Sequence, residues 1–342
     1  MSEDKIWEVK RIKYKGQVEE SISSKKEKGP RLIRNKKVVA KIEEIPKVIS
    51  KETKKEAIDH VSKVMEDIKY GRTINGQETK KAMKGMIKEL TENKEAMLEL
   101  EKIKEYDKYT FTHSLNVCIL SLLIGLELRL SQDQLEELGV GALLHDVGKT
   151  FINNNIINKE EHLDSREYEE IKKHPLYSYK IISQDQSIGE MPKIIAYQHH
   201  ERYNGFGYPQ GLKDTKINKY AVMVSLGDVY DALIADRVYK RGLLPYEAMK
   251  IIIGSSGTDF DPNITSSFVR CMSIYPSGSL VRLNTGEIAM VVKVSKQSII
   301  RPFIRIVLDS QGEICKETIE IDLMKDDKHF IIGAVDVDIF SK

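Results

Sequence analysis

Cysteine is scarce in this sequence, and the few cysteines present are far apart. Cys118, Cys271 and Cys315 are the only ones among 342 residues. An odd, dispersed set excludes a disulfide framework and a CxxC metal knuckle. We therefore expect a protein of a reducing compartment, the cytoplasm.

Long apolar runs are also missing. The longest largely apolar stretch, residues 115–126, is too short to span a bilayer, which takes about 20 residues. It is expected to form a buried helix. Residues 1–10 lack the apolar core of a signal peptide. The sequence thus predicts a cytoplasmic protein with no membrane span.

No charge of one sign dominates. The chain has 54 Lys and Arg against 52 Asp and Glu, a net charge of +2, as in ordinary soluble proteins. Basic residues are in surplus in residues 1–60 and in slight deficit afterwards. The simplest interpretation of the basic segment is a solvated Lys-rich face; contact with a membrane surface or a partner is the alternative. The rest of the chain is no general binder of DNA or RNA, so any anion site must be local.

Four segments differ in their residue pattern. Residues 1–50 are Lys-rich, with short β-branched pieces that predict weak strands and loops. Residues 51–108 repeat apolar side chains every three or four positions, which predicts two amphipathic helices. Residues 109–275 are almost entirely helical in pattern, and residues 276–342 alternate short β-rich runs with turns. The predicted fold is mainly α: a helical bundle with an N-terminal α(+β) segment and a small C-terminal β module.

Histidines and buried carboxylates are the residues that carry chemistry. Six of the eight histidines fall within the helical region, and one of them, His162, lies in a charged stretch that predicts surface. Asp228 and Asp231 are three residues apart in an otherwise apolar helix, where an unpaired carboxylate is costly. Each residue alone could be an ordinary hydrogen-bonded core residue, but together they favour a shared metal site. The five histidines of interest are His113, His145, His174, His199 and His200.

Imidazole and carboxylate ligands suit first-row divalent metals such as iron or manganese. Two such ions about 3.5–4 Å apart can lower the pKa of a shared water and stabilise an in-line phosphoryl displacement. An aspartate beside a histidine, as in His145–Asp146, can bridge two metals while the histidine binds one. Lys149, one helical turn after His145, can neutralise a phosphate oxygen as charge develops. The ligand types are therefore suited to divalent metal ions, iron or manganese.

Two stretches resemble the signatures of the HD-GYP family, the HD-domain phosphohydrolases associated with hydrolysis of cyclic di-GMP. They are HDVGK at residues 145–149 and HHERYNGFGYP at residues 199–209. The resemblance is close over about residues 100–275 and implies a helical HD-type phosphohydrolase bundle. Shorter supporting pieces follow in the family's order at residues 109–117, 173–175, 227–233, 236–240 and 257–262.

The resemblance implies two metal sites that share Asp146 as a bridge. The first metal would be held by His113, His145, Asp146 and Asp228. The second would be completed by His174, His199 and His200.

The resemblance also assigns residues to the substrate and to catalysis. Lys149 would contact the scissile phosphate, and Asp231 would orient Lys149 or the attacking water, unless it only makes a structural hydrogen bond. Arg237 and Lys240 would grip phosphate or guanine, since arginine offers a bidentate fork. The GYP loop would shape the substrate site through Asn204, Gly205, Tyr208 and Pro209.

Two positions depart from the family pattern. Asn204 replaces an aspartate of the GYP loop; it keeps a turn-forming side chain, so we expect an intact loop. Tyr109 stands where some members have a glutamate that holds a third metal, so we expect two metals.

The implied activity is hydrolysis of cyclic di-GMP to pGpG, with GMP from a second turnover left open. Two alternatives are a non-catalytic cyclic di-GMP sensor acting through a flanking module, and a phosphohydrolase of another nucleotide. The complete ligand set with Lys149 disfavours the first, and the GYP loop with Arg237 and Lys240 disfavours the second. A homodimer through residues 51–108 is left open.

Overall fold

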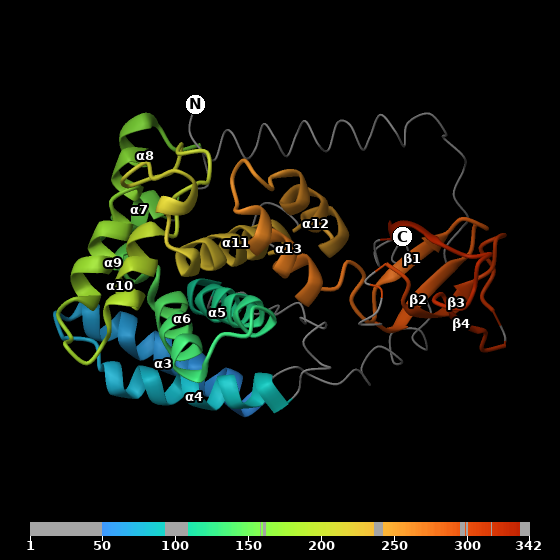
Figure 1. Ribbon diagram of the computed structural model, residues 1–342, viewed down its shortest axis with the longest axis horizontal. Coiled ribbons are helices and arrows are strands. Elements are labelled where there is room, and N and C mark those ends of the chain that lie inside the picture. Colours follow the sequence, from blue (N-terminus) through green and yellow to red (C-terminus); the bar gives the residue numbers. More distant parts are fainter. Residues whose placement is uncertain are drawn as a thin grey trace. The chain divides into compact units, whose positions relative to one another are not determined.

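The computed structural model describes residues 50–92, 109–157, 159, 162–235, 242–294, 298, 300–315 and 317–335. These residues divide into a helical unit and a second unit that carries a β-sheet. The helical unit comprises Lys47–Gly242 and Ile252–Cys271, and the second includes Leu243–Ile251 and residues from Met272 onward. Figure 1 shows the helices and the sheet with their labels.

Two short 3-10 helices lie among the α-helices of the described residues. In chain order they are α3 (Lys51–Lys69), α4 (Gly76–Glu92), α5 (Tyr109–Glu127), α6 (Gln132–Leu144), η3 (Val147–Phe151), α7 (Asn154–Ile157), α8 (Ser165–Ile171), α9 (His174–Ile182), α10 (Glu190–Gln198), η4 (Asp214–Lys216), α11 (Lys219–Ile234), α12 (Pro245–Gly254) and α13 (Pro262–Cys271).

Helices α5 and α11 form the centre of the helical unit, because a helix that is apolar on all sides must be buried. α5 packs against α6, α11 and α13, while α10 packs against α6 and α9 (Figure 1). Gly227 of α11 lies close to α5, since a Cβ there would come within 3.3 Å of the Leu120 Cβ. The buried run predicted at residues 115–126 is thus confirmed as part of the central helix α5.

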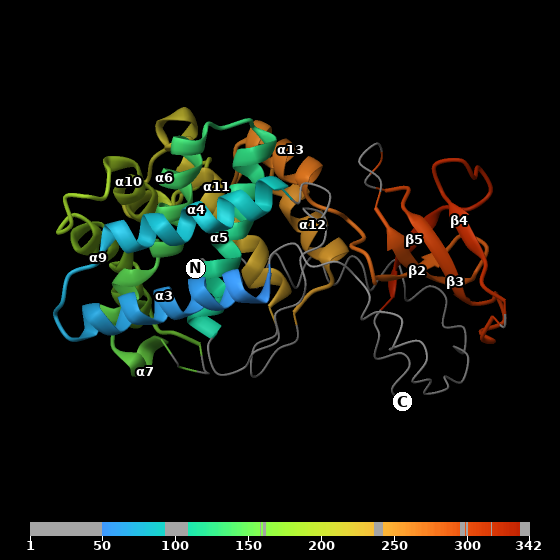
Figure 2. The same cartoon turned by 90° about the horizontal axis from the view of Figure 1, so that it is seen from below.

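Helices α3 and α4 run side by side on the outside of this core (Figure 2). Ser50 caps α3, and the Glu89 carboxylate on α4 accepts hydrogen bonds from the Ser50 and Thr53 hydroxyls, which fixes one helix on the other. Gly71 ends the first helix with a φ of 74°, in the left-handed region. The periodicity of residues 51–92 is confirmed by the buried residues Ala57, Val61, Val64, Met65, Ile68, Met83, Met86, Ile87 and Leu90.

The second unit contains the predicted β module as a five-stranded antiparallel sheet in the order β4-β3-β2-β1-β5. Gly286 and Gly312, both at positive φ, lie in the turns β1–β2 and β3–β4. The strands are β1 (Leu280–Leu283), β2 (Ile288–Lys293), β3 (Phe303–Leu308), β4 (Glu320–Asp322) and β5 (Ile331–Val335). Their core is formed by Leu280, Ile288, Met290, Leu308 and Val335.

The mainly helical fold with a C-terminal β module is therefore confirmed. Within the described residues, no helix combines the length and apolar character needed to cross a membrane. The weak strands predicted in the first 50 residues fall almost wholly outside the described part of the chain.

Candidate metal centre

The HDVGK turn brings the end of α6 against the start of α9. His145 caps α6, and Asp146 follows at the entry to η3. The Gly148 backbone N–H donates to the Ser178 hydroxyl of α9 at 2.8 Å. A Cβ on Gly148 would lie 2.2 Å from the His174 carbonyl oxygen, so only glycine permits this approach. The close packing of the turn is what brings Asp146 to His174.

Three imidazoles are fixed by the backbone three residues before them. The Nδ1 atoms of His145, His174 and His199 lie 2.7, 2.7 and 2.8 Å from the carbonyl oxygens of Ala142, Ile171 and Ala196. A carbonyl oxygen can only accept, so each Nδ1 carries the proton and donates. Each Nε2 therefore presents a lone pair, which is the form of histidine that binds a metal.

The two carboxylate oxygens of Asp146 face different sets of imidazoles. Oδ2 lies 3.3 Å from His145 Nε2 and 3.7 Å from His113 Nε2. Oδ1 lies 3.2 Å from His174 Nε2 and 3.7 Å from His199 Nε2. This is the placement that a bridging carboxylate requires.

Two donor groups result, and they share Asp146. The ligand atoms within each group all lie within 4.8 Å of one another. The first donor group is His113, His145 and Asp146, and the second donor group is Asp146, His174, His199 and His200.

The second donor group cannot be explained by hydrogen bonds alone. His174 Nε2 lies 3.3 Å from His199 Nε2 and 3.2 Å from His200 Nε2. Because the Nδ1 protons of His174 and His199 are already donated, their Nε2 lone pairs point at each other. His145 Nε2 and Asp146 Oδ1 are also buried without a hydrogen-bond partner among the described residues. A divalent cation would satisfy these atoms, so both groups are consistent with a metal-binding HD site.

His113, on α5, connects the first donor group to two carboxylates of α11. Its Nε2 lies 3.2 Å from Asp228 Oδ1. Its Nδ1 donates to Asp231 Oδ2 at 2.7 Å, and the Asn116 amide donates to Asp231 Oδ1 at 2.7 Å. Asp231 thus fixes His113 by a hydrogen bond, the structural role that the sequence left open beside an orienting contact with Lys149 or the attacking water. A carboxylate behind a ligand histidine sets its tautomer and ring orientation.

Burial and neighbouring charges shift the pKa values of His113 and Asp146 in opposite directions. Burial opposes a charge on His113, but Asp228 and Asp231 outweigh it and raise the pKa of His113 well above its usual value. Burial likewise opposes ionisation of Asp146, but His145 and Lys149 reverse this and hold the pKa of Asp146 well below its usual value. His113 is therefore the imidazole at which a metal and a proton compete.

The imidazoles of the second donor group are neutral. Burial lowers the pKa of His174. Burial is the largest cause that lowers the pKa of His199 and His200 well below the usual value, and the neighbouring imidazoles also disfavour a further positive charge. These three side chains are in the ligand form at neutral pH.

Lys149 reaches the shared carboxylate from η3. Its Nζ lies 2.5 Å from Asp146 Oδ2, and its side chain is 31% exposed. A cation at this edge of the cluster faces both the donor groups and solvent, so it can meet an anionic group that approaches the site.

The GYP loop packs on the second donor group. The Tyr208 ring stacks on the His200 imidazole with centroids 4.7 Å apart, and the peptide bond to Pro209 is cis. A Cβ on Gly207 would come within 2.4 Å of the Arg202 backbone nitrogen, so the loop folds tightly over the residues that follow His200.

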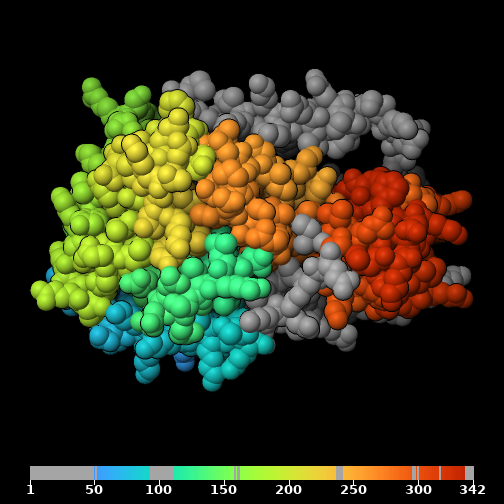
Figure 3. Space-filling view, in the orientation of Figure 1, coloured from blue at the N-terminus to red at the C-terminus, as the bar shows by residue number. Residues whose placement is uncertain are grey.

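Asn204, which replaces the aspartate of the family pattern, makes two side-chain hydrogen bonds in the loop. Its Oδ1 accepts from the Phe206 N–H at 2.9 Å, and its Nδ2 donates to Asp259 Oδ1 at 3.2 Å. An aspartate could not donate to Asp259. The space-filling view shows residues around 200–215 lying against residues around 260 (Figure 3), and the Asn204 N–H donates to the Thr258 carbonyl at 2.8 Å.

Glu201 is a site residue that the sequence reasoning missed. Its side chain is 2% exposed, and its carboxylate accepts from the Gln210 and Leu212 N–H groups at 2.7 and 2.8 Å. It thereby closes the base of the GYP loop, in which Gly205 has a φ of 81°. The available signal was its position directly after His200.

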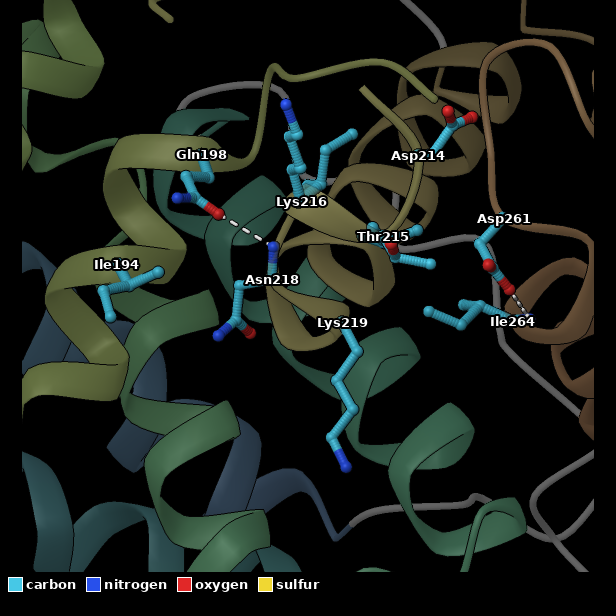
Figure 4. Close-up of a pocket in the computed structure, with 11 residues that line it drawn as sticks. Ile194, Gln198, Asp214, Thr215, Lys216, Asn218, Lys219, Asp261 and Ile264 are labelled. Atoms are coloured by element: carbon cyan, nitrogen blue, oxygen red, sulfur yellow. Dashed lines mark hydrogen bonds between the residues drawn. The ribbon is translucent and has the colours of Figure 1, made fainter. Parts of the chain in front are cut away.

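Arg237 and Lys240 lie outside the described residues, so their contact with substrate stays a prediction. A separate groove of about 510 Å³ lies beside Gln198, η4, the start of α11 and Ile264, and none of the predicted site residues lines it (Figure 4). Within it, Gln198 Oε1 accepts from the Asn218 N–H, which ties the end of α10 to the start of α11.

Comparison with known proteins gives two family matches. A family described as HD domain matches residues 85–264, and one described as KOW domain associated with HD domain matches residues 280–342.

Individual relatives cover part of the chain. It is 30% identical over 254 residues to "Cyclic di-GMP phosphodiesterase PA4108" of Pseudomonas aeruginosa, covering 74% of this chain and 61% of that protein. It is 30% identical over 208 residues to "Cyclic di-GMP phosphodiesterase PdeB" of Borreliella burgdorferi, covering 61% of this chain and 55% of that protein. The chain thus spans little more than half the length of these relatives.

A solved structure shares the fold. It is described as Bd1817, a HDG"Y"P protein from Bdellovibrio bacteriovorus, with a TM-score of 0.51 and 20% sequence identity over 63% of this chain and 69% of that chain.

Proposed function

The chain belongs to the HD-domain family and has HD-GYP-like relatives, and we propose that it is a cyclic di-GMP phosphodiesterase that uses two divalent metal ions, iron or manganese. One observation carries the proposal: the two oxygens of Asp146 face two separate sets of imidazoles, with His145 on one side and His174 on the other. The names of the curated relatives support the choice of substrate.

The proposed ligands follow the two donor groups. When bound, two divalent ions supply an activated water at neutral pH and stabilise charge on the phosphate oxygens. Asp231 keeps His113 in the tautomer that offers Nε2. His113, His145, Asp146 and Asp228 would hold the first ion, and Asp146, His174, His199 and His200 the second.

Lys149 is proposed to bind the scissile phosphate. Its ammonium contacts Asp146 at the partly exposed edge of the cluster, where it can neutralise a phosphate oxygen as negative charge develops. Water adds to phosphorus, the bond to the ribose 3′ oxygen breaks, and that oxygen leaves with a proton. The product is linear pGpG, and a second round on pGpG, if the site accepts it, would give two GMP.

The GYP loop is proposed to shape the substrate site. Tyr208 stacks on His200, while Glu201 and Asn204 hold the two sides of the loop. Gly205 and Pro209 complete the loop, and Arg237 and Lys240 are proposed to contact phosphate or guanine.

Hydrolysis by purified protein is the direct test. Protein loaded with iron or manganese should convert cyclic di-GMP to pGpG, and His145→Ala or Asp146→Ala should lower kcat at least about 100-fold, since each removes a ligand. The matched control is His162→Ala, an exposed histidine outside both donor groups. Chromatography of the products gives the rates.

The outcomes separate the alternatives. Binding of cyclic di-GMP without turnover in metal-loaded protein would identify a sensor. Turnover of a different nucleotide alone would identify another phosphohydrolase.

A further inference from the structure

Lys172 is held between two tyrosine rings beside the cluster. It follows the last residue of α8, and its Nζ lies 5.6 Å from the Tyr168 ring centroid and 5.7 Å from the Tyr208 ring centroid. The same ammonium contacts the Glu169 carboxylate at 2.9 Å, and its side chain is 30% exposed. Cation–π contacts of this kind restrain a flexible lysine without neutralising it.

Only one aromatic ring separates Lys172 from the second donor group. The Tyr208 ring lies 4.7 Å from the His200 ring and 6.5 Å from the His174 ring, centroid to centroid. Lys149, by contrast, contacts Asp146 Oδ2, the oxygen that faces the first donor group. A lysine is therefore associated with each of the two groups.

The charge on Lys172 remains available to a ligand. Its partner Glu169 is 66% exposed, and an ion pair in such solvent contributes little. An ammonium also has three N–H donors, so one contact with Glu169 does not saturate it. An anion that enters beside Tyr208 can share the Lys172 ammonium with Glu169, or can replace Glu169 as its partner.

A cyclic dinucleotide needs a second cation. It has two phosphodiesters with one negative charge each, and only one of them can occupy the position of the bond being broken. Lys149 is assigned above to the scissile phosphate, and Arg237 and Lys240 to phosphate or guanine. A cation beside the second donor group would therefore add to the groups that can bind the other phosphate.

We propose that Lys172 binds the second, non-scissile phosphate of the cyclic dinucleotide, with Tyr168 and Tyr208 holding the ammonium in place. The inference rests on the proposed phosphodiesterase function and adds a substrate-binding residue to it. The competing role for Lys172 is purely structural, in which it only fastens the GYP loop through Tyr208.

A pair of neighbouring lysines gives the test. Lys172→Met removes the charge but keeps most of the apolar stem. Lys173→Met is the matched control, because Lys173 makes the same kind of i,i+3 pair, with Glu170, and its side chain is 50% exposed. Steady-state kinetics on cyclic di-GMP and metal content are measured for both variants and for Lys172→Arg.

A phosphate-binding role predicts a KM effect without a metal effect. In Lys172→Met, KM should rise about tenfold, the equivalent of about 1.4 kcal/mol, with kcat within about twofold and metal content unchanged. Lys172→Arg should recover most of the affinity, and Lys173→Met should match the unmodified protein.

Three distinct results would overturn the inference. If the unmodified protein turns over cyclic di-GMP and Lys172→Met has the KM of Lys173→Met, the inference fails and the proposed function stands. If Lys172→Met instead lowers the metal content and kcat together, the role of Lys172 is to hold the GYP loop in place through Tyr208. Absence of turnover by the unmodified metal-loaded protein would defeat the proposed function, and this inference with it.

Discussion

At the scale of single residues, Asp231 shows how a carboxylate serves a metal site without touching the metal. Both of its oxygens accept hydrogen bonds, from His113 and from Asn116, and the side chain is almost fully buried. It holds the His113 ring with Nε2 directed at Asp228 and Asp146. The ring orientation of His113 thus depends on a residue of another helix.

Replacing Asp231 by Asn should weaken the first metal. The amide carries no charge and can present its N–H₂ to His113, which favours the wrong tautomer. Loss of such a partner lowers metal affinity about 10–100-fold, so we expect loss of one ion at low metal concentration. Titration of the metal-free protein with manganese measures this, with exposed Asp133→Asn as control. Unchanged affinity would refute the role given to Asp231.

Residue identity predicted the members of the cluster better than their contacts. The chemistry of imidazole and carboxylate, and the family resemblance, pointed to all seven candidate ligands, and the structure brings them together. The partner of Asp231 could not be predicted, because His113 lies 118 positions away and meets it only through the packing of α5 on α11. The donation from Asn204 to Asp259 is equally a product of tertiary structure.

At the scale of elements, the N-terminus of α4 is held by a hydrogen bond to Asp185, which lies in a loop distant in sequence. The Gly76 N–H donates to Asp185 Oδ2 at 2.7 Å, and a Cβ on Gly76 would lie 2.5 Å from the Ser187 hydroxyl oxygen. Burial opposes the charge of Asp185, but the bonds from Ser187 and Gly76 outweigh it and lower its pKa. A negative charge at a helix N-terminus is also favoured by the helix dipole.

This contact predicts a pH-dependent contribution to stability. The pKa of Asp185 is lower in the folded state, so the ionised carboxylate stabilises the fold above its unfolded pKa of about 3.9, and the contribution is lost as pH falls through the folded value. Asp185→Asn should lower the free energy of unfolding by about 1 kcal/mol at pH 7. Urea denaturation at pH 7 and at about pH 3 measures the difference, which should shrink at the lower pH. A difference that stays constant would contradict the electrostatic explanation.

Periodicity was sufficient to predict the amphipathic pair α3 and α4, because each buries one face and exposes the other. It was equally sufficient for the β-rich C-terminal pattern, where alternation and turn residues are local signals. The fastening of α4 by Asp185 is not local, since 109 positions separate the two bonded residues.

At the scale of the whole molecule, the proposed ligands come from separate parts of one unit. They lie on α5, after α6, at the start of α9, after α10 and on α11, while the β-sheet belongs to the other unit and has its own core. Ions bound at these positions would link five segments of the helical unit that are distant in sequence.

Removal of metal should therefore loosen one unit selectively. A ligand at 100 times its Kd stabilises the state it binds by about 2.7 kcal/mol, so a chelator should lower Tm by several degrees. Hydrogen exchange on the full chain, with and without chelator, should show faster exchange in α5, α9 and α11 and no change in β1–β3. Equal acceleration in both units would contradict a metal centre confined to the helical unit.

Backbone carbonyl oxygens at helix ends fix the rings of His145, His174 and His199. Each acceptor sits a single turn upstream of its ring, so the main chain itself decides which nitrogen is offered to a cation. Fraying of α10 by one turn would release the Ala196 carbonyl from His199 and free that ring to flip. Retention of ions at this centre would then depend on the integrity of the ends of these helices.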